Sequence, residues 1–350
     1  MLTSWMPFLR PGAALLPLLL AACEGAAQVS DGEPRVPSAQ GEWAPRAPMP
    51  QARTEVSVAT DGRLAYVIGG FARADGGTVA PRAMFIYDPA ADRWTTSPDS
   101  IPEGVNHAGF VFLDGKLYIV GGFRENTFEP TGAVRIYDLA AGTWTDGPPL
   151  PTPRGALSLA VLDGRIHAIG GNAANAGALD PAQHNVGPDG SSVGTHEVFD
   201  PATGEWTRLA PMPTARNHAG AAAVNGKIHV VAGRVGGNAT LTAHEVYDPG
   251  TDSWSAAAPV PTGRSGIAVV TLRGAVYVFG GETFGAVQKT FDEAERYDPA
   301  TGRWASLPRM PTARHGLGAA AIGDAIFVIA GGPRPGFAFS AVNERLTPAR

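Results

Sequence analysis

Short apolar runs alternate with tight turns along most of the chain. In residues 210–233, APMPTARNHAGAAAVNGKIHVVAG, a run of small apolar residues, an Asn-Gly turn and a second apolar run follow one another. Two apolar runs joined by Asn-Gly or Asp-Gly are a strong hairpin signal, because both turn residues must adopt positive φ. Versions of this stretch occur six times. The pattern therefore predicts a repeated β-hairpin unit.

Two further strands complete each unit. A third apolar run ends in Tyr-Asp-Pro or a relative, and a fourth carries a tryptophan. Beyond Trp5 near the N-terminus, the tryptophans stand at 43, 94, 144, 206, 254 and 304. Gly-Gly doublets keep the same phase at 69–70, 121–122, 170–171, 280–281 and 331–332, and Ala232-Gly233 fills the remaining place. A period of about 50 residues with four short strands predicts a propeller or a solenoid.

The doublet glycines, the Tyr-Asp pair and the tryptophan together resemble the kelch motif. The resemblance covers residues 41–350 and implies an all-β fold, a six-bladed kelch β-propeller whose four-stranded blades surround a central channel. The last repeat stops before its tryptophan strand, whereas Trp43 precedes the first complete repeat. We therefore expect residues 41–49 to supply the outer strand of the sixth blade, which closes the ring and removes two open sheet edges.

Composition agrees with a turn-rich β protein. Of 350 residues, 45 are Gly and 31 are Pro, and 44% are hydrophobic. The formal net charge of −5 argues against broad nucleic-acid binding.

The N-terminus predicts membrane attachment. Cys23 is the one cysteine, so no intrachain disulfide can form. Leu20-Ala21-Ala22-Cys23 resembles the lipobox of bacterial lipoproteins, which implies a signal peptide over 1–22 and a lipid anchor on Cys23. Residues 23–40 then form a flexible tether, and the propeller sits in the bacterial envelope on the periplasmic or outer-membrane face. The alternative is a buried N-terminal helix with an incidental cysteine.

The turn before each first strand carries the candidate chemistry. Five of six repeats place an arginine there, namely Arg53, Arg154, Arg216, Arg264 and Arg314. In kelch propellers this turn lies at the mouth of the channel, so the resemblance implies that these residues border it. The arginines either capture a carboxylate or a sulfate-like group, or bond the carbonyls of a neighbouring blade.

The residues just beyond the arginines vary between repeats. The candidate ligand-binding positions are Glu55, Asn106, His107, Asn217, His218 and His315, beside the five arginines. Three histidines in alternate repeats could in principle form a metal site. No short ligand spacing supports one, so we predict no metal and no cofactor. Glu55 and Glu282 could share a pocket with an imidazole for acid–base work, but no catalytic residue is assigned.

The other polar repeat positions have structural interpretations. His167 and His229 replace tyrosines of other repeats and should be half-buried, His196 and His244 share a third-strand position, and His184 lies in a long loop. Glu197, Glu245, Glu295 and Glu344 occupy one equivalent site and indicate a structural ladder. The long loop, residues 172–194, is either a lid over the channel mouth or a plain surface insertion.

Two classes of function remain. The first is an envelope-tethered module that binds an unknown protein, or a small anionic or sugar ligand, through the channel-mouth face. The alternative is a periplasmic isomerase similar to the sialic-acid mutarotases, whose carboxylate substrate would suit an arginine-lined pocket. An enzyme similar to galactose oxidase is excluded, because its copper site needs a Cys-Tyr link and the one cysteine, Cys23, belongs to the lipobox.

Overall fold

The computed structural model describes residues 40–236 and 239–349. The expected signal peptide, the lipidation site Cys23 and all but the last residue of the tether lie outside these residues. The described chain is all-β, as predicted, and is consistent with a β-propeller. Within it, no helix is long and apolar enough to cross a membrane.

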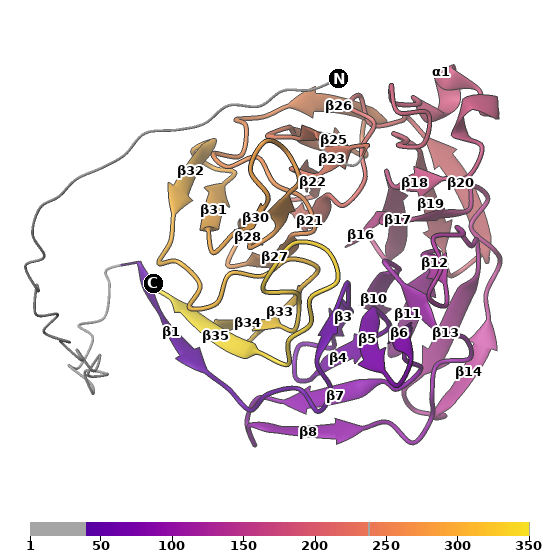
Figure 1. The fold of residues 1–350 in the computed structure, drawn as a ribbon. Helices are drawn as coiled ribbons and strands as arrows, with labels where there is room; N and C mark the ends of the chain where they lie inside the picture. The colour runs from indigo at the N-terminus through magenta and orange to yellow at the C-terminus, as the bar shows by residue number, and fades with distance from the viewer. Residues whose placement is uncertain (1–39, 237–238, 350) are drawn as a thin grey trace, which may run out of the picture. The chain divides into compact units, whose positions relative to one another are not determined.

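Six four-stranded antiparallel sheets make up most of the described chain, and Figure 1 shows them following one another in chain order. We number them sheets 1 to 6 and call the segment that contributes each sheet a repeat. Their strands are β3 (Ser57–Thr60), β4 (Ala65–Ile68), β7 (Phe85–Asp88) and β8 (Arg93–Thr96); β10 (Gly109–Leu113), β11 (Lys116–Val120), β13 (Val134–Asp138) and β14 (Thr143–Asp146); β16 (Ser158–Leu162), β17 (Arg165–Ile169), β19 (His196–Asp200) and β20 (Glu205–Leu209); β21 (Gly220–Val224), β22 (Lys227–Val231), β25 (His244–Asp248) and β26 (Ser253–Ala256); β27 (Ala268–Leu272), β28 (Ala275–Phe279), β31 (Ala294–Asp298) and β32 (Arg303–Ser306); β33 (Gly318–Ile322), β34 (Ala325–Ile329), β35 (Asn343–Pro348) and β1 (Gly41–Pro45).

Shorter elements lie in the loops that join these strands. They are β2 (Arg53–Thr54), β5 (Phe71–Ala74), β6 (Gly77–Val79), β9 (Val105–Asn106), β12 (Phe123–Arg124), β15 (Arg154–Gly155), β18 (Asn172–Ala173), η1 (Ala176–Ala178), α1 (Pro181–His184), β23 (Arg234–Val235), β24 (Ala239–Thr240), β29 (Glu282–Thr283) and β30 (Lys289–Thr290). Several of them position the candidate site, because pairs such as β2–β5, β9–β12 and β15–β18 connect the turn before a first strand to the loop after its doublet.

Neighbouring sheets pack through their first strands. In chain order β3, β10, β16, β21, β27 and β33 each contact the next, and β33 also contacts β3, which lies beside it in Figure 1. Strand β1 pairs antiparallel with β35, so residues from the two ends of the described chain share sheet 6. The Trp43 indole lies in an edge-on contact with Phe279 at 5.8 Å and donates a hydrogen bond to the carbonyl of Pro308 at 2.8 Å.

The tryptophans join neighbouring sheets. Trp254 of β26, for example, donates its indole N–H to the carbonyl of Ala210, which follows β20 in the preceding sheet. Its ring also packs on Tyr247 with the ring centroids 5.2 Å apart. The contact both buries apolar area and satisfies the indole N–H.

One doublet is shifted by a residue from its predicted place. The pair with the conformation of the other doublets is Ala330-Gly331, with φ of 58° and 96°, rather than Gly331-Gly332. Ala232-Gly233 has nearly the same angles, 56° and 97°. Two repeats therefore use Ala-Gly. Gly332 occupies the position in repeat 6 that Glu282 occupies in repeat 5, because each pairs with the residue that follows the arginine of the repeated turn.

Two buried histidine pairs lie between the second and third strands of sheets 3 and 4. His229 Nδ1 lies 2.9 Å from His244 Nε2, and His244 Nδ1 donates to the carbonyl of Ala258. His167 and His196 form the same contact at 2.9 Å. All four are buried, so the expected half-burial of His167 and His229 was too low. Burial lowers the pKa of His229 and of His244 from 6.5 to about 4.

These pKa shifts predict acid sensitivity that a double substitution should reduce. Between pH 6.5 and about 4 the unfolded chain protonates His229 and His244 while the folded chain does not, so stability present above pH 6.5 is lost as pH falls. The loss should be on the order of 2 kcal/mol per histidine near pH 4.5. His229→Tyr with His244→Ala copies Tyr277 and Ala294 of sheet 5 and should reduce the loss of stability at low pH. Urea unfolding at pH 6.5 and pH 4.5 measures the free energy of unfolding of both proteins. Equal losses in wild type and variant would contradict it.

Candidate functional site

The five arginines of the repeated turn are structural. Each has an exposed fraction of 0%. Arg154 donates to the carbonyls of Gly170 and Ala168, both at 2.8 Å, and pairs with Glu197 at 2.5 Å. Those partners belong to the same repeat as Arg154, so the expectation of bonds to a neighbouring blade is corrected. The side chain folds back beneath its own sheet, where it satisfies carbonyls at the end of the second strand.

The glutamate ladder is the other half of these contacts. Arg264 pairs with Glu295 and Arg314 with Glu344, each at 2.6 Å, and Arg216 pairs with Glu245. Arg53 is the exception, because Phe85 occupies the glutamate position and the guanidinium lies 4.5 Å from its ring centroid. Burial lowers the pKa of Arg53 to about 10.

These contacts correct the proposed anion site. None of the five arginines lines any of the five cavities described in this section, and most of their donors face carbonyls and carboxylates. The isomerase alternative depended on an arginine-lined pocket for a sugar acid. It therefore has no support in the arrangement of these residues.

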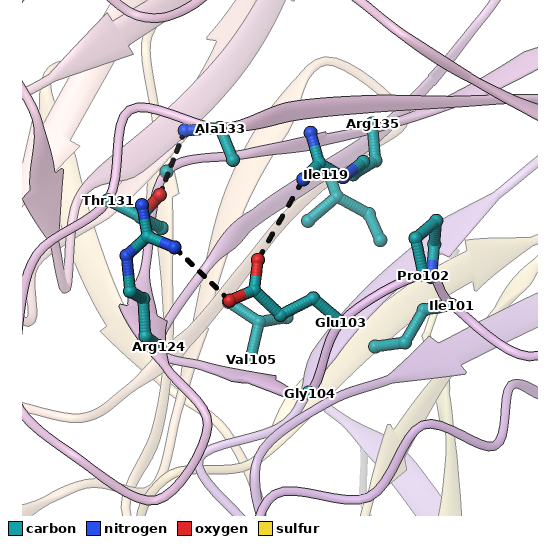
Figure 2. Close-up of a pocket in the computed structure, with 11 residues that line it drawn as sticks. Ile101, Pro102, Glu103, Gly104, Val105, Ile119, Arg124, Thr131, Ala133 and Arg135 are labelled. Carbon is teal, nitrogen blue, oxygen red and sulfur yellow. Dashed lines mark hydrogen bonds and ion pairs between the residues drawn. The ribbon is translucent and has the colours of Figure 1, made fainter.

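Repeat 2 lacks both members of the pair, and a small cavity marks the place. Val105 stands where the other repeats have arginine, and Arg135 stands where they have glutamate. Figure 2 shows Glu103 between Arg124, at 3.3 Å, and Arg135, at 3.8 Å, beside this cavity. Its volume of about 20 Å³ is room for roughly one water molecule, so it is not a ligand site.

Removing one member of a buried pair should be far more costly than removing both. Arg264→Met leaves the Glu295 carboxylate buried without its partner and should lower the free energy of unfolding by about 3–5 kcal/mol. Adding Glu295→Met should restore most of that loss. The exposed pair Arg273–Asp324 is the control, and Arg273→Met should cost less than about 1 kcal/mol. Additive single losses in the denaturation measurements would contradict a coupled pair.

The candidate site lies at one end of a row of cavities lined by the first strands. Three cavities of about 110, 150 and 360 Å³ follow one another along β3, β10, β16, β21, β27 and β33. A further cavity of about 190 Å³, which we call the outer cavity, is lined by Glu55, His107, Arg234, Glu282 and several phenylalanines. Glu55 and His107 line both the outer cavity and the first cavity of the row.

Side chains reach this point because of an unusual backbone conformation. At the equivalent position of the six repeats the chain has φ between 50° and 64°, at Glu55, His107, Ala156, His218, Gly266 and Gly316. Hydrogen bonds link these positions between repeats, for example from His218 N to the carbonyl of Ala156 at 3.0 Å. A left-handed non-glycine residue costs about 1 kcal/mol or more, and such strain concentrates at functional sites.

Small residues at the remaining positions make room for the large ones. A Cβ on Gly316 would lie 2.6 Å from the Glu55 carboxyl carbon, and a Cβ on Gly332 would lie 2.4 Å from Cε1 of His315. Ala156 stands between His107 and His218, whose ring centroids are 4.8 Å apart. Side chains from repeats 1, 2, 4, 5 and 6 therefore meet.

We call Glu55, His107, His218, Glu282 and His315 the His–Glu cluster. His107 Nε2 lies 3.2 Å from a Glu55 carboxylate oxygen. His315 Nε2 lies 3.4 Å from Glu55 and 3.4 Å from Glu282. The predicted meeting of Glu55 and Glu282 with imidazoles is thus present, and it unites residues far apart in sequence.

Burial dominates the electrostatics of the cluster. Burial and, to a lesser degree, the nearby Glu282 carboxylate raise the pKa of Glu55 to about 8, while Arg234 acts in the opposite direction. Burial also lowers the pKa of His107 to about 3 and lowers those of His218 and His315. Near neutral pH the three imidazoles are therefore uncharged.

Arg234 and a set of phenylalanines complete the site, and sequence reasoning missed them. Arg234 donates to Glu282 at 3.0 Å and to His218 Nε2 at 2.9 Å. Phe71, Phe128 and Phe337 form what we call the aromatic wall. Phe71 lies at its centre, and its ring centroid is 5.2 Å from that of Phe337 and 6.1 Å from that of Phe128. Arg234 directly follows Ala232-Gly233, so the position after each doublet was the available signal.

The two asparagines of the candidate list support the cluster from behind. Asn106 and Asn217 each contact the Nδ1 atom of the following histidine at 2.6 Å. Residues 172–194 brace one of them, because Ser192 accepts a hydrogen bond from Asn217. No residue of this segment, all of which is described, lines the outer cavity, so the segment is a support and not a lid. Its His184 is buried against Thr195 at 2.9 Å.

Comparisons with known proteins identify kelch repeats in this chain. A model described as the KLHDC2/KLHL20/DRC7 Kelch-repeats domain matches residues 188–332, and a Kelch motif model matches residues 105–151. Kelch-like protein terF of Aspergillus terreus is 30% identical over 198 residues, 55% of this chain and 41% of that protein. Kelch-like protein 35 of Mus musculus is 32% identical over 164 residues, 47% and 24% of the two chains. The chain thus covers less than half the length of these relatives.

Proposed function

We propose that this kelch-repeat protein is a binding module, not an enzyme, whose partner protein docks on the face around the outer cavity. In this proposal the six sheets are the blades of a six-bladed propeller that β1 closes. Residues 41–350 form that domain. The repeats and the relatives named kelch-like support an interaction role.

The exposed aromatic wall carries the proposal. Phe128 and Phe337 have exposed fractions of 59% and 58% although both rings pack on Phe71. Aromatic side chains are enriched at protein interfaces, and clustered exposed ones mark binding surfaces. They come from loops of repeats 2 and 6, so the surface exists only in the folded chain.

The outer cavity favours a particular kind of anchor. Its walls are aromatic, and its floor carries Arg234 between Glu282 and His218. A volume of about 190 Å³ is below that of a drug-sized site. We infer that one partner side chain with an apolar body and a polar end enters it, while the surrounding phenylalanines cover more of the partner.

The proposal places the protein at the bacterial envelope. Residues 1–22 would be removed, Cys23 would carry the lipid, and residues 23–40 would let the propeller reach partners from the periplasmic or outer-membrane face. The lipobox resemblance of Leu20–Cys23 supports this placement.

The test compares interaction at the aromatic wall with a matched loss of apolar surface elsewhere. The full chain is cross-linked in cells and purified from the envelope fraction. Phe128→Ala with Phe337→Ala should lose the cross-linked partner by at least about 10-fold, because buried aromatic anchors contribute 2 kcal/mol or more. Val287→Ala, at a residue 68% exposed that does not line the outer cavity, should retain it. Retention by both variants would contradict the proposal, and Cys23→Ala in the same experiment should move the protein out of the membrane fraction.

A further inference from the structure

We propose that the His–Glu cluster binds a divalent first-row metal ion, with Zn²⁺ as the best match. The ligands are Nε2 of His107, His218 and His315 and the carboxylates of Glu55 and Glu282. They form two groups that share Glu55: Glu55, His107 and His218, and Glu55, Glu282 and His315. Within each group the ligand atoms lie within 4.8 Å of one another.

The hydrogen bonds of Asn106 fix the orientation of the His107 imidazole. The Asn106 amide nitrogen donates to the carbonyls of Glu125 and Thr127 at 2.7 and 3.2 Å. Its oxygen therefore faces His107 Nδ1, which must carry the proton. The lone pair of His107 is then on Nε2, which points at Glu55.

His218 is oriented in the same way by a longer chain of bonds. Ser192 donates to Asp189 at 2.8 Å and accepts from the Asn217 amide nitrogen at 2.7 Å. The Asn217 oxygen therefore accepts from His218 Nδ1. Independently, Arg234 can only donate, so the 2.9 Å contact with His218 Nε2 requires a lone pair there.

His315 completes the set. Its Nδ1 lies 3.1 Å from the carbonyl of Gly332, which can only accept, so Nδ1 is protonated and the lone pair of the neutral imidazole is on Nε2. Three imidazoles thus turn their Nε2 lone pairs toward the carboxyl groups of two glutamates, and His107 and His315 lie 3.2–3.4 Å from Glu55 and Glu282. An Nδ1–H held by an outer acceptor is the arrangement that orients metal-binding histidines.

The donor atoms select the ion. Imidazole nitrogen and carboxylate oxygen without thiolate suit Zn²⁺ and its first-row neighbours rather than Ca²⁺ or Cu⁺. The outer cavity, lined by Glu55, His107 and Glu282, provides an entry path. Sequence spacing predicted no metal because the ligands come from five repeats and His315 lies one position before the other two histidines.

Arg234 competes with the metal. Its guanidinium bonds Glu282 and His218, a ligand from each group, and it would have to turn away when an ion binds. The ring of Phe284 at the cavity wall offers an alternative contact for the displaced side chain, because the Arg234 guanidinium already lies 5.4 Å from that ring centroid. Removal of the Arg234 guanidinium should therefore strengthen metal binding, an effect that a purely structural cluster would not show.

The full chain is first treated with a chelator, and Zn²⁺ binding is then measured by calorimetric titration. A second titration with Co²⁺ records the visible absorption expected of Co²⁺ bound by nitrogen and oxygen ligands. His218→Ala copies Ala156, and Glu55→Gly copies Gly266 and Gly316, so both replacements already occur at this backbone position. The matched control is His167→Tyr with His196→Ala, which removes two buried histidines outside the cluster and copies Tyr277 and Ala294.

Wild type and control should bind one or two Zn²⁺ per chain, and His218→Ala and Glu55→Gly should weaken binding by more than about 100-fold. Asn106→Ala should weaken it by about 10–100-fold, as loss of an outer partner does. Arg234→Met should strengthen it. Absence of Zn²⁺ binding to folded wild type, or equal affinity of wild type and His218→Ala, would overturn the proposal. The readout does not depend on partner docking, so it can fail while the proposed function holds.

Discussion

The buried arginine of the repeated turn is the interaction on which the rest of the structure depends. Its guanidinium holds the end of the second strand through carbonyls, and in four repeats it reaches a glutamate of the third strand. Taking that pair out of water is costly, and the attraction compensates only when the geometry is good and further hydrogen bonds satisfy the remaining donors, as the three guanidinium nitrogens of Arg154 illustrate. The turn before the first strand is consequently fixed against its own sheet, and the residue two positions after the arginine has a defined direction.

This left-handed residue, two positions after the arginine, connects the structural scaffold to the candidate site. Its left-handed conformation is the same in all six repeats, whereas its side chain is Glu, His, Ala, His, Gly and Gly in turn. The strain is spread over a hydrogen-bonded set of neighbours, so substitution changes what meets at the end of the cavities without changing the frame. Repeat 2 shows that the frame tolerates loss of the ion pair, because Arg135 and Glu103 replace it with a more exposed contact.

Residues of the His–Glu cluster and of the aromatic wall line the same outer cavity, and those of the cluster are the more buried on average. Phe128 and Phe337 are exposed, while Glu282 and His315 have exposed fractions of 2% and 1%. The wall suits contact with a partner, and the buried groups suit a small, charged guest. Residues 172–194 act indirectly on the cluster and on Arg234 beside it, since Asp189 holds Ser192 and also accepts from the backbone of Gly236, two residues after Arg234.

The sequence by itself determined the repeat, its four strands, the hairpin turns and the position of each candidate residue within a repeat. These depend on local patterns such as Asn225-Gly226, whose conformation is set by neighbours in the chain. It also indicated that Glu55 and Glu282 could share a pocket with an imidazole. Only the tertiary structure decided that Arg216 and its counterparts turn inward, that His315 reaches the cluster despite its offset, and that Arg234 lies among the ligands. Those outcomes depend on which side chains of repeats about 50 residues apart converge and on the space that Gly316 and Gly332 leave, which no pattern within one repeat contains.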